Sequence, residues 1–386
     1  MRIGIDARMY GPKIGGAGVG RYVEEIVTHL QQLDTENEYV LFLRRANFDD
    51  CAIPPALKSR WTKVVADIPW YSLAEQLYMP RIIYKQKLDL IHYPHFNVPL
   101  RAKTPFVCTI HDLIMLDQTW ASRATTLAPW KYQLKQFGQQ KILAHIAQHA
   151  RNIITVSDYA KGQIIHRLNI SPDRVHVVYN GVESAAILAQ KQNKQTARSL
   201  PLPPGVQTPF FLNVGNPYPH KNIETLLHAF SFFVKEHPEA HLVLVGPRNS
   251  FTQQLEAEAR EIEIPSNRVH FLGFVDDTML SNLYSQASVY VIPSKLEGFG
   301  IPPLEALSHG TPVAASRASS IPEILGPAAT YFDPNDIEDL FAAMETLLTN
   351  KQERIRVLSA SHDVLKKYSW DDHARALMDL YTISRS

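Results

Sequence analysis

Short apolar runs alternate with longer amphipathic stretches along nearly the whole chain. The runs are rich in Val, Ile or Phe, and most are separated by enough residues for a helix, which is typical of strands alternating with helices. We expect strands at Arg2–Asp6, Tyr39–Leu43, Leu88–His92, Phe106–Ile110, Asn152–Val156, Val175–Tyr179, Phe210–Val214, His241–Val245, Val269–Leu272, Val289–Ile292 and Thr311–Ala315. Because strands that alternate with helices pair in parallel through right-handed crossovers, the pattern predicts two successive α/β regions.

One long segment interrupts this alternation. Residues 190–207 read QKQNKQTARSLPLPPGVQ, which is first polar and then Pro-rich, as linkers are. We therefore expect one Rossmann-like domain over residues 1–189, a linker over 190–207 and a second Rossmann-like domain over 208–367. Ligands of open α/β sheets bind beyond the carboxyl ends of the strands, so two such sheets facing across a cleft would share a site. Two independent domains with separate tasks are the alternative.

Composition and charge narrow the class of protein. With 386 residues, 45% hydrophobic and 20% charged, the chain is long and apolar enough for two folded domains, which excludes a disordered protein. The net charge is +1, but residues 1–183 hold 22 basic and 16 acidic residues, and the remainder holds 17 and 22. This imbalance indicates an anionic partner for the first half, although chance scatter explains it equally well.

Cysteine content and hydropathy exclude several further classes. Cys51 and Cys108 alone cannot form a disulfide framework or a four-ligand zinc site. No apolar run approaches the ~20 residues of a spanning helix, and the N-terminus reads as a strand rather than a signal peptide. We expect a cytoplasmic protein, with peripheral contact to the inner face of a membrane left open.

The strongest chemical pattern follows the expected strand Val289–Ile292. Residues 293–306 read PSKLEGFGIPPLEA, a glycine-bearing loop and then a helix start where the two prolines need no N–H partner. Backbone amides at such a helix start bind anions. Glu297 and Glu305 flank the loop, and carboxylates accept hydrogen bonds from the paired hydroxyls of sugars and riboses. The pattern favours a nucleotide-sugar site over a surface glutamate and a glutamate that pairs with the helix dipole.

These residues carry a specific resemblance. Glu297 and Glu305, with seven residues between them in EGFGIPPLEAL, resemble the E-x7-E signature of the retaining glycosyltransferases of family 4, which have the GT-B fold. The resemblance implies that Glu297 contacts the transferred sugar and that Glu305 contacts the nucleoside ribose. It also places the backbone of Gly298, Phe299, Gly300 and Ile301 against the sugar and diphosphate. Residues 368–386 resemble the family's terminal helix, which crosses back onto the first domain.

A lysine follows the first strand of the second domain, in the sequence GNPYPHKN at 215–222 and before an expected helix Ile223–Phe230. Lys221 can neutralise a departing diphosphate as a point charge. The alternative is a lysine that lies in a turn with its side chain in water and has no role in binding. The family usually has an arginine nearby, but this chain has Asn216 and His220 instead. The resemblance therefore assigns the role of the family lysine to Lys221, and it assigns the role of the family arginine to no residue of this chain.

Two elements of the first domain complete the expected site. His111 ends the expected strand Phe106–Ile110, and the resemblance implies that it orients the sugar and the acceptor. Asp112 either orients its ring or caps a helix. Residues 15–20 read GGAGVG, which does not satisfy the G-x-G-x-x-G dinucleotide fingerprint. In the family this loop closes over the donor phosphates, and Gly16 is the expected contact; a turn before a helix near Gly20 is the alternative.

A basic stretch over residues 118–157 contains no acidic residue. Leu127, Trp130, Leu134 and Phe137 recur at steps of three and four, flanked by Lys131 and Lys135. Such a helix either lies on an anionic membrane or packs on the sheet with its lysines in water. We favour packing, because helices between strands usually pack in this way. No nucleic-acid-binding pattern is present, so no nucleic acid partner is expected.

The reaction expected from this resemblance is metal-independent transfer of a sugar with its anomeric configuration kept. No D-x-D occurs, and neither a metal nor another cofactor is expected. Asp6-Ala7-Arg8, Gly20-Arg21-Tyr22 and Glu75-Gln76 are similar to mannosyltransferases of bacterial polysaccharide assembly, which favours GDP-mannose as donor and a glycan or lipid-linked acceptor. Phe274 or Val275 is expected to pack on the base. A nucleotide-sugar 2-epimerase and a non-catalytic nucleotide-sugar-binding protein are the rivals.

Overall fold

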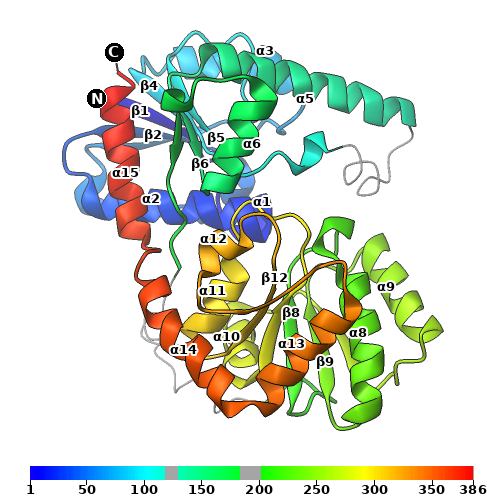
Figure 1. The fold of residues 1–386 in the computed structure, drawn as a ribbon. Helices are drawn as coiled ribbons and strands as arrows, with labels where there is room; N and C mark the ends of the chain where they lie inside the picture. The colour runs from blue at the N-terminus through cyan, green and yellow to red at the C-terminus, as the bar shows by residue number, and fades with distance from the viewer. Residues whose placement is uncertain (118–128, 183–200, 386) are drawn as a thin grey trace. The chain divides into compact units, whose positions relative to one another are not determined.

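The computed structural model describes residues 1–117, 129–182 and 201–385. The chain forms two compact units, each built on a parallel sheet (Figure 1). Unit 1 contains Met1–Leu116, Thr125–Gly181 and Ser369–Ser386, and unit 2 contains Asp117–Ala124 and Val182–Tyr368. Most of the expected linker lies outside the described residues. Its end packs on unit 2, where the Asn282 side chain donates a hydrogen bond to the Pro201 carbonyl at 3.1 Å.

The sheet of unit 1 has seven parallel strands in the order β3-β2-β1-β4-β5-β6-β7. They are β1 (Arg2–Asp6), β2 (Glu38–Leu43), β3 (Trp61–Val65), β4 (Leu90–Tyr93), β5 (Phe106–Thr109), β6 (Ile153–Thr155) and β7 (Val175–Val177). The strand order reverses between β1 and β4, and such a reversal opens a crevice at the carboxyl ends of the two strands.

Helices cover both faces of this sheet. One face carries α2 (Arg21–Leu33) and α15 (Trp370–Ile383), and the other carries α3 (Leu73–Tyr84), α5 (Pro129–His149) and α6 (Asp158–Leu168); α1 (Pro12–Gly15) precedes α2. Alternate strand residues supply the two cores, since Tyr39 and Leu41 pack with α2 while Val40 and Phe42 pack with the α3 side. The C-terminal helix thus belongs to unit 1 although it follows unit 2 in the chain.

The sheet of unit 2 has six parallel strands in the order β10-β9-β8-β11-β12-β13. They are β8 (Phe210–Val214), β9 (His241–Val245), β10 (Val269–Gly273), β11 (Val289–Ile292), β12 (Val313–Ser316) and β13 (Thr330–Phe332). The helices are α8 (Ile223–Glu236), α9 (Ser250–Glu261), α10 (Asp277–Gln286), α11 (Ile301–Ser308), α12 (Ile321–Leu325), α13 (Ile337–Thr349) and α14 (Lys351–Leu365). Here the order reverses between β8 and β11.

The structure confirms the expected strands to within a few residues at their ends and adds two that the pattern does not reveal. β3 is the edge strand WTKVV, in which Thr62 and Val65 are exposed and Trp61 alone is buried, so its hydrophobic signal is weak. β13 has only three residues and pairs with β12 at the other sheet's edge. Both units are therefore Rossmann-like α/β units with parallel sheets, as the pattern predicts.

Candidate active site

The carboxyl ends of β8 and β11 bring two expected site residues together. Lys221 lies in the loop after β8 and Glu297 in the loop after β11, and Lys221 Nζ lies 2.6 Å from Glu297 Oε1. The same oxygen accepts a hydrogen bond from Ser294 Oγ at 2.8 Å. These loops flank the reversal of strand order, which is where open α/β sheets bind ligands.

Backbone contacts hold Glu297 in place. Its N–H donates to Ser319 Oγ at 2.9 Å, and its carbonyl accepts from Ser320 Oγ at 3.0 Å. On the other side, Asn222 adopts the left-handed conformation at φ 58° and donates from its side-chain amide to the Pro293 carbonyl at 3.0 Å. The loops that carry Lys221 and Glu297 are therefore tied to each other and to the segment after β12. Sequence reasoning missed these serines and this asparagine, which only the folded register reveals.

The expected backbone segment lies at the start of α11. Gly300 has φ +94°, a conformation that side chains rarely adopt, and Ile301 begins the helix with the two prolines directly behind it. The Phe299 ring is buried and meets the Tyr368 ring edge-on, with centroids 5.4 Å apart. This packing fixes the loop from Gly298 to Ile301 beside Glu297.

Glu305 lies in α11 and accepts a hydrogen bond at Oε2 from the Tyr284 hydroxyl at 2.8 Å. Both glutamates of the signature act on Tyr290 of β11. Burial raises the pKa of this phenol well above its usual range, and the negative charges of Glu297 and Glu305 raise the pKa further. The Tyr290 hydroxyl donates to the Val214 carbonyl at the end of β8. The two glutamates of the signature and Lys221 thus share one neighbourhood of unit 2.

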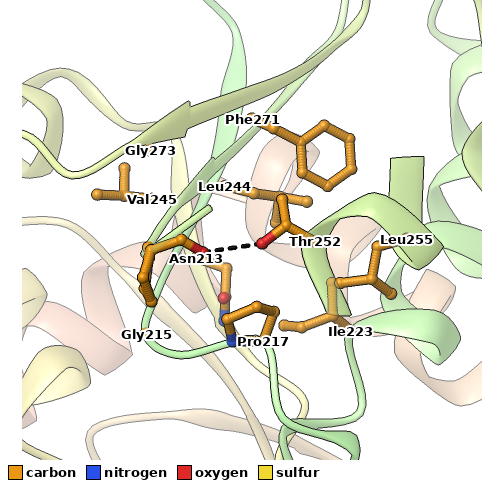
Figure 2. Close-up of a pocket in the computed structure, with 12 residues that line it drawn as sticks. Asn213, Gly215, Pro217, Ile223, Leu244, Val245, Thr252, Leu255, Phe271 and Gly273 are labelled. Carbon is orange, nitrogen blue, oxygen red and sulfur yellow. Dashed lines mark hydrogen bonds between the residues drawn. The ribbon is translucent and has the colours of Figure 1, made fainter. Parts of the chain in front are cut away.

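A pocket opens beside this neighbourhood (Figure 2). It is lined by residues at the ends of β8, β9 and β10 and at the starts of α8 and α9, namely Asn213, Gly215, Pro217, Ile223, Leu244, Val245, Gly246, Pro247, Thr252, Leu255, Phe271 and Gly273. A Cβ on Gly246 would lie 2.0 Å from the Gly215 carbonyl oxygen, so the close approach of these two loops requires glycine. Phe274 follows the pocket with 73% of its surface exposed.

Neither residue at the positions of the family arginine supplies a cation. Burial lowers the pKa of His220 to about 4, and the neighbouring Lys221 charge lowers it further, so the imidazole is neutral at pH 7. Its Nδ1 is buried and has no hydrogen-bond partner among the described residues. Asn216 is exposed and its carbonyl accepts from the Tyr218 N–H. In the described part of the chain, Lys221 is the basic side chain paired with Glu297.

The glycine loop of unit 1 forms one turn of π-helix over Gly16–Gly20. A Cβ on Gly15 would lie 2.1 Å from the Met9 carbonyl oxygen, and one on Gly20 would lie 2.3 Å from the Gly11 carbonyl oxygen. Gly16 has φ +78°, and a Cβ added to it would meet nothing within 4 Å. Gly15 and Gly20 therefore permit the tight packing of the loop, while Gly16 presents bare backbone to its surroundings.

His111 follows β5, and its ring is fixed by two contacts. Its Nε2 lies 3.0 Å from the Pro94 carbonyl, which accepts the Nε2 proton, and the Tyr22 ring meets it edge-on at 4.6 Å between centroids. Burial lowers the pKa of His111 to about 4. The neutral ring therefore presents Nδ1 as an acceptor. Asp112 Oδ1 accepts from the Ile114 N–H at 3.0 Å and so supports the following turn.

A buried hydrogen-bond chain lies behind His111. The Tyr22 hydroxyl lies 3.1 Å from Thr109 Oγ1, which in turn lies 2.8 Å from His92 Nε2. His92 Nδ1 bonds the Tyr381 hydroxyl at 2.7 Å, and His373 Nε2 lies 3.3 Å from the Tyr22 hydroxyl. Two of these side chains come from α15, so the C-terminal helix supports the wall of unit 1 that carries His111. Sequence reasoning missed this chain, because its members are spread from residue 22 to residue 381.

The Asp6-Ala7-Arg8 motif forms a buried ion cluster. Arg8 binds Asp6 through two hydrogen bonds of 2.8 and 2.6 Å and contacts Glu75 Oε1 at 2.5 Å. The Asn97 amide donates to both carboxylates, and the Arg8 side chain is fully buried. The Asp6-Ala7-Arg8 motif, which favours a mannosyltransferase in the sequence, thus connects β1 to α3 and to the segment after β4.

The described residues contain neither a cluster of metal ligands nor a membrane-spanning helix. No three histidine, cysteine or acidic side chains of residues 1–117, 129–182 and 201–385 gather in a way that could hold a metal ion. None of the helices described is long and apolar enough to cross a bilayer.

Comparison with known proteins now identifies the class. Residues 16–185 match the family model Glycosyltransferase Family 4, and residues 201–361 match the model Glycosyl transferases group 1. The fold is GT-B: the sucrose-phosphate synthase of Thermosynechococcus elongatus superposes with a TM-score of 0.74 at 21% identity, covering 99% of this chain and 98% of that one. The Anabaena protein HepE in complex with UDP and glucose gives 0.70 at 17% identity, with 99% of each chain covered.

The two family models together span most of the chain. The protein is therefore a glycosyltransferase, with a Glycosyltransferase Family 4 domain followed by a Glycosyl transferases group 1 domain. It is 28% identical to the O-antigen chain mannosyltransferase B of Escherichia coli over 95% of this chain and 96% of that protein. It is also 28% identical to the serotype-specific mannosyltransferase WbdA of E. coli over 76% of this chain, but that match spans about a third of WbdA, 34% of its length.

Proposed function

We propose that the protein transfers mannose from GDP-mannose to a hydroxyl of a glycan or lipid-linked acceptor, with the anomeric configuration kept. The observation that carries the proposal is the Lys221–Glu297 pair at the carboxyl ends of β8 and β11. A cation for the diphosphate and a carboxylate for sugar hydroxyls lie side by side there. The full-length similarity to an O-antigen mannosyltransferase supports mannose as the sugar and polysaccharide assembly as the setting.

The residues of unit 2 hold the donor in this proposal. Lys221 and the backbone amides from Gly298 to Ile301 stabilise the diphosphate, and Glu297 accepts hydrogen bonds from the sugar hydroxyls. Glu305, held by Tyr284, binds the ribose. We place the base at the pocket beside β8, β9 and β10, because it lies at the carboxyl ends of these strands, where open α/β sheets bind ligands.

The residues of unit 1 act on the reacting end. His111, neutral and fixed by the Pro94 carbonyl, accepts a hydrogen bond at Nδ1 from a hydroxyl of the sugar. Gly16 brings bare backbone against the donor phosphates. The acceptor would be held on this unit, and a lipid-linked acceptor places the reaction at the inner face of a membrane.

The proposed step is a same-face displacement. The bond between the anomeric carbon and the diphosphate oxygen breaks while the acceptor oxygen bonds to that carbon from the same side. The acceptor proton passes to a donor phosphate oxygen, and the products are GDP and the mannosylated acceptor. Lys221 and the amides offset the charge that develops on the diphosphate, so the step needs no metal ion.

The experiment that tests the donor is a thermal-shift and calorimetric titration with GDP-, UDP-, dTDP- and ADP-sugars. We expect GDP-mannose to bind at least about tenfold more tightly than the other donors, about 1.4 kcal/mol. NMR of the product then gives the anomeric configuration, and turnover unchanged by EDTA gives metal independence. Preferred binding of another base contradicts the donor, and an inverted product contradicts the mechanism.

The same assay separates the rival functions. An epimerase of this fold would convert the donor to its epimer without an added acceptor. A non-catalytic binding protein would bind the donor but show neither transfer nor slow donor hydrolysis. The sequence similarity to mannosyltransferases favours transfer over both.

A further inference from the structure

Tyr71 of unit 1 combines an unusual backbone conformation with an exposed ring. It precedes α3, adopts the left-handed conformation at φ 59° and leaves 41% of its surface exposed. Residues other than glycine rarely adopt this conformation, and those that do are concentrated at ligand-binding and active sites. The Tyr71 N–H donates to Glu75 Oε2 at 2.8 Å, which holds the backbone in place. The fold thus maintains an exposed tyrosine in a strained conformation.

The buried ion cluster holds Tyr71 against the segment that follows β4. Glu75 accepts from the Tyr71 N–H at one carboxylate oxygen and from the Asn97 amide, at 3.0 Å, at the other. Arg8, which follows β1, pairs with the same carboxylate. Because the strand order of this sheet reverses between β1 and β4, these segments border the crevice where open α/β sheets bind ligands. The cluster therefore places Tyr71 at the ligand-binding edge of unit 1.

The side chain of Tyr71 reaches His95, which lies just beyond the carboxyl end of β4. The Tyr71 hydroxyl lies 2.7 Å from His95 Nδ1 and has no other partner among the described residues, so we assign the hydroxyl as the donor. Burial and the neighbouring His111 lower the pKa of His95 to about 3, which keeps the ring neutral at pH 7. A neutral imidazole that accepts at Nδ1 carries its proton on Nε2. In the described part of the chain His95 Nε2 has no partner, so this partly exposed side chain offers a free donor.

His95 lies beside the histidine that acts on the reacting sugar in the proposed function. The rings of His95 and His111 are 6.1 Å apart between their centroids and inclined by 32°. His111 gives its Nε2 proton to the Pro94 carbonyl and so presents an acceptor, whereas His95 presents a donor. A neighbouring donor and acceptor match the hydroxyl groups of a sugar, and the exposed Tyr71 ring adds an aromatic surface for its C–H groups.

The charges that act on Tyr71 distinguish a sugar from a phosphate. Burial raises the pKa of Tyr71, the carboxylates of Glu75 and Asp112 raise it further, and Arg8 opposes them. The Arg8 side chain is fully buried, and its guanidinium is bound by Asp6 and Glu75, so it does not reach a ligand. A phosphate requires exposed cations, whereas sugar hydroxyls do not. The surroundings of Tyr71 therefore favour an uncharged sugar.

We infer that Tyr71 and His95 form the acceptor subsite and bind an uncharged sugar ring of the acceptor. The sugar ring packs on the Tyr71 side chain, and one of its oxygens accepts a hydrogen bond from His95 Nε2 beside His111. The acceptor is then a glycan, free or lipid-linked, that enters by its sugar end, and a lipid phosphate is not the acceptor. The inference rests on the proposed function, because the bound sugar is an acceptor only if the protein transfers a sugar to it.

The test compares compounds that share a tail and differ in their polar group. Saturation-transfer NMR measures binding of octyl α-mannoside, octyl β-N-acetylglucosaminide and octyl phosphate to the full-length protein. We expect at least one glycoside to bind about tenfold or more tightly than octyl phosphate. His95→Asn keeps an amide near the Tyr71 hydroxyl but places nothing at the position of Nε2, so it should weaken glycoside binding about tenfold. His95→Gln, whose amide reaches the position of Nε2, should stay within about threefold of the native affinity.

A matched pair of tyrosines flanks α3. Tyr71→Ala should weaken glycoside binding as His95→Asn does, whereas Tyr84→Ala, which removes a ring that is 77% exposed at the other end of the helix, should leave it unchanged. Binding of octyl phosphate as tight as that of the better glycoside, binding of neither glycoside, or native affinity in His95→Asn overturns the inference. GDP affinity is measured on the same samples. Loss of glycoside binding with native GDP affinity shows that the variants are folded, and a native protein that binds glycosides but not GDP contradicts the proposed function instead.

Discussion

Lys221 and Glu297 are 76 positions apart in the chain, yet their charged groups lie 2.6 Å from each other where the strand order of unit 2 reverses. Because the ammonium group and the carboxylate hold each other in place, a diphosphate and a sugar would meet side chains that are already positioned. Ser294 also donates to Glu297 Oε1, so within the described residues both of these contacts fall on one carboxylate oxygen, and in the proposed donor complex Oε2 would accept from a sugar hydroxyl.

The first prediction concerns the charge of Glu297. Glu297→Gln keeps the shape and the contact with Ser294 but removes the carboxylate. We expect kcat to fall about 100-fold or more, about 2.7 kcal/mol, because the charge acts on the reacting sugar. The Kd for GDP should change less than about threefold, about 0.7 kcal/mol. Ser294→Ala is the matched control, and normal turnover in Glu297→Gln would rule out the proposed role.

The second prediction concerns the nucleoside end. Tyr284→Phe removes the hydroxyl that donates to Glu305 Oε2 at 2.8 Å. A hydrogen bond to a carboxylate contributes about 1.5–3 kcal/mol, so calorimetry should show GDP affinity lowered about tenfold, with less effect on kcat at saturating donor. Tyr290→Phe, whose hydroxyl bonds a backbone carbonyl instead, serves as the control. If the Tyr284 variant binds GDP as tightly as the native protein, Glu305 does not depend on this contact.

Much of the fold could be predicted because its strands are buried on both faces. The run His241–Val245 is entirely buried and its pattern predicts its bounds, whereas the edge strand β3 alternates apolar and exposed residues too weakly to be recognised. The E-x7-E spacing likewise predicted two neighbouring carboxylates, because Glu297 lies in the loop before α11 and Glu305 lies within that helix.

The hydrogen-bond chain behind His111 could not be predicted in the same way. Tyr22, Thr109 and His373 meet through pairing of β5 and docking of α15, and no local pattern reports contacts over such separations. Similarly, the spacing of Trp130, Leu134 and Phe137 predicts an apolar stripe but not which side of the helix faces the sheet. Ile142 and Ile146 are buried and the stripe is exposed, so the expectation that its aromatic residues pack on the sheet is wrong for the first half of α5; Leu127 lies outside the described residues.

The third prediction tests why the loop after β1 is rich in glycine. Gly15→Ala places a methyl group 2.1 Å from the Met9 carbonyl oxygen, so we expect a loss of stability of about 2 kcal/mol or more. Gly16→Ala meets open space but keeps φ +78°, which costs about 1 kcal/mol. Gly18→Ala, with nothing within 4 Å, is the neutral control. Denaturant titration measures all three, and equal stability of the Gly15 and Gly18 variants would contradict the packing argument.

The fourth prediction concerns pH. Burial lowers the pKa of His111 and His373 to about 4, and that of His92 and His95 to about 3. Because the unfolded chain binds these protons near pH 6.5, the stabilising contribution is present above that pH and is lost as the pH falls toward the folded pKa values. Each histidine contributes a slope of at most about 1.4 kcal/mol per pH unit in this window.

Denaturant titrations at pH 7.5 and 5.5 measure this effect. His29, whose pKa is raised by Glu25 and Asp371 against the opposing effect of burial, acts with the opposite sign and offsets part of the loss. We expect the midpoint for unit 1 to fall on acidification, and to fall less in the variant His373→Gln, which removes one buried imidazole. A midpoint that stays constant between these pH values contradicts the burial of neutral histidines.

The last prediction separates the structural role of Arg8 from a role in binding. Arg8→Met leaves Asp6 and Glu75 buried without their cation, so we expect a loss of stability of about 3–5 kcal/mol. The triple variant Asp6→Asn, Arg8→Met, Glu75→Gln removes all three charges, and we expect it to recover much of that loss, because no unpaired ion remains. If the cluster only positions β1 and α3, GDP affinity of the folded triple variant stays within about threefold of the native value, about 0.7 kcal/mol. Loss of GDP binding with native stability would instead make Arg8 part of the donor site.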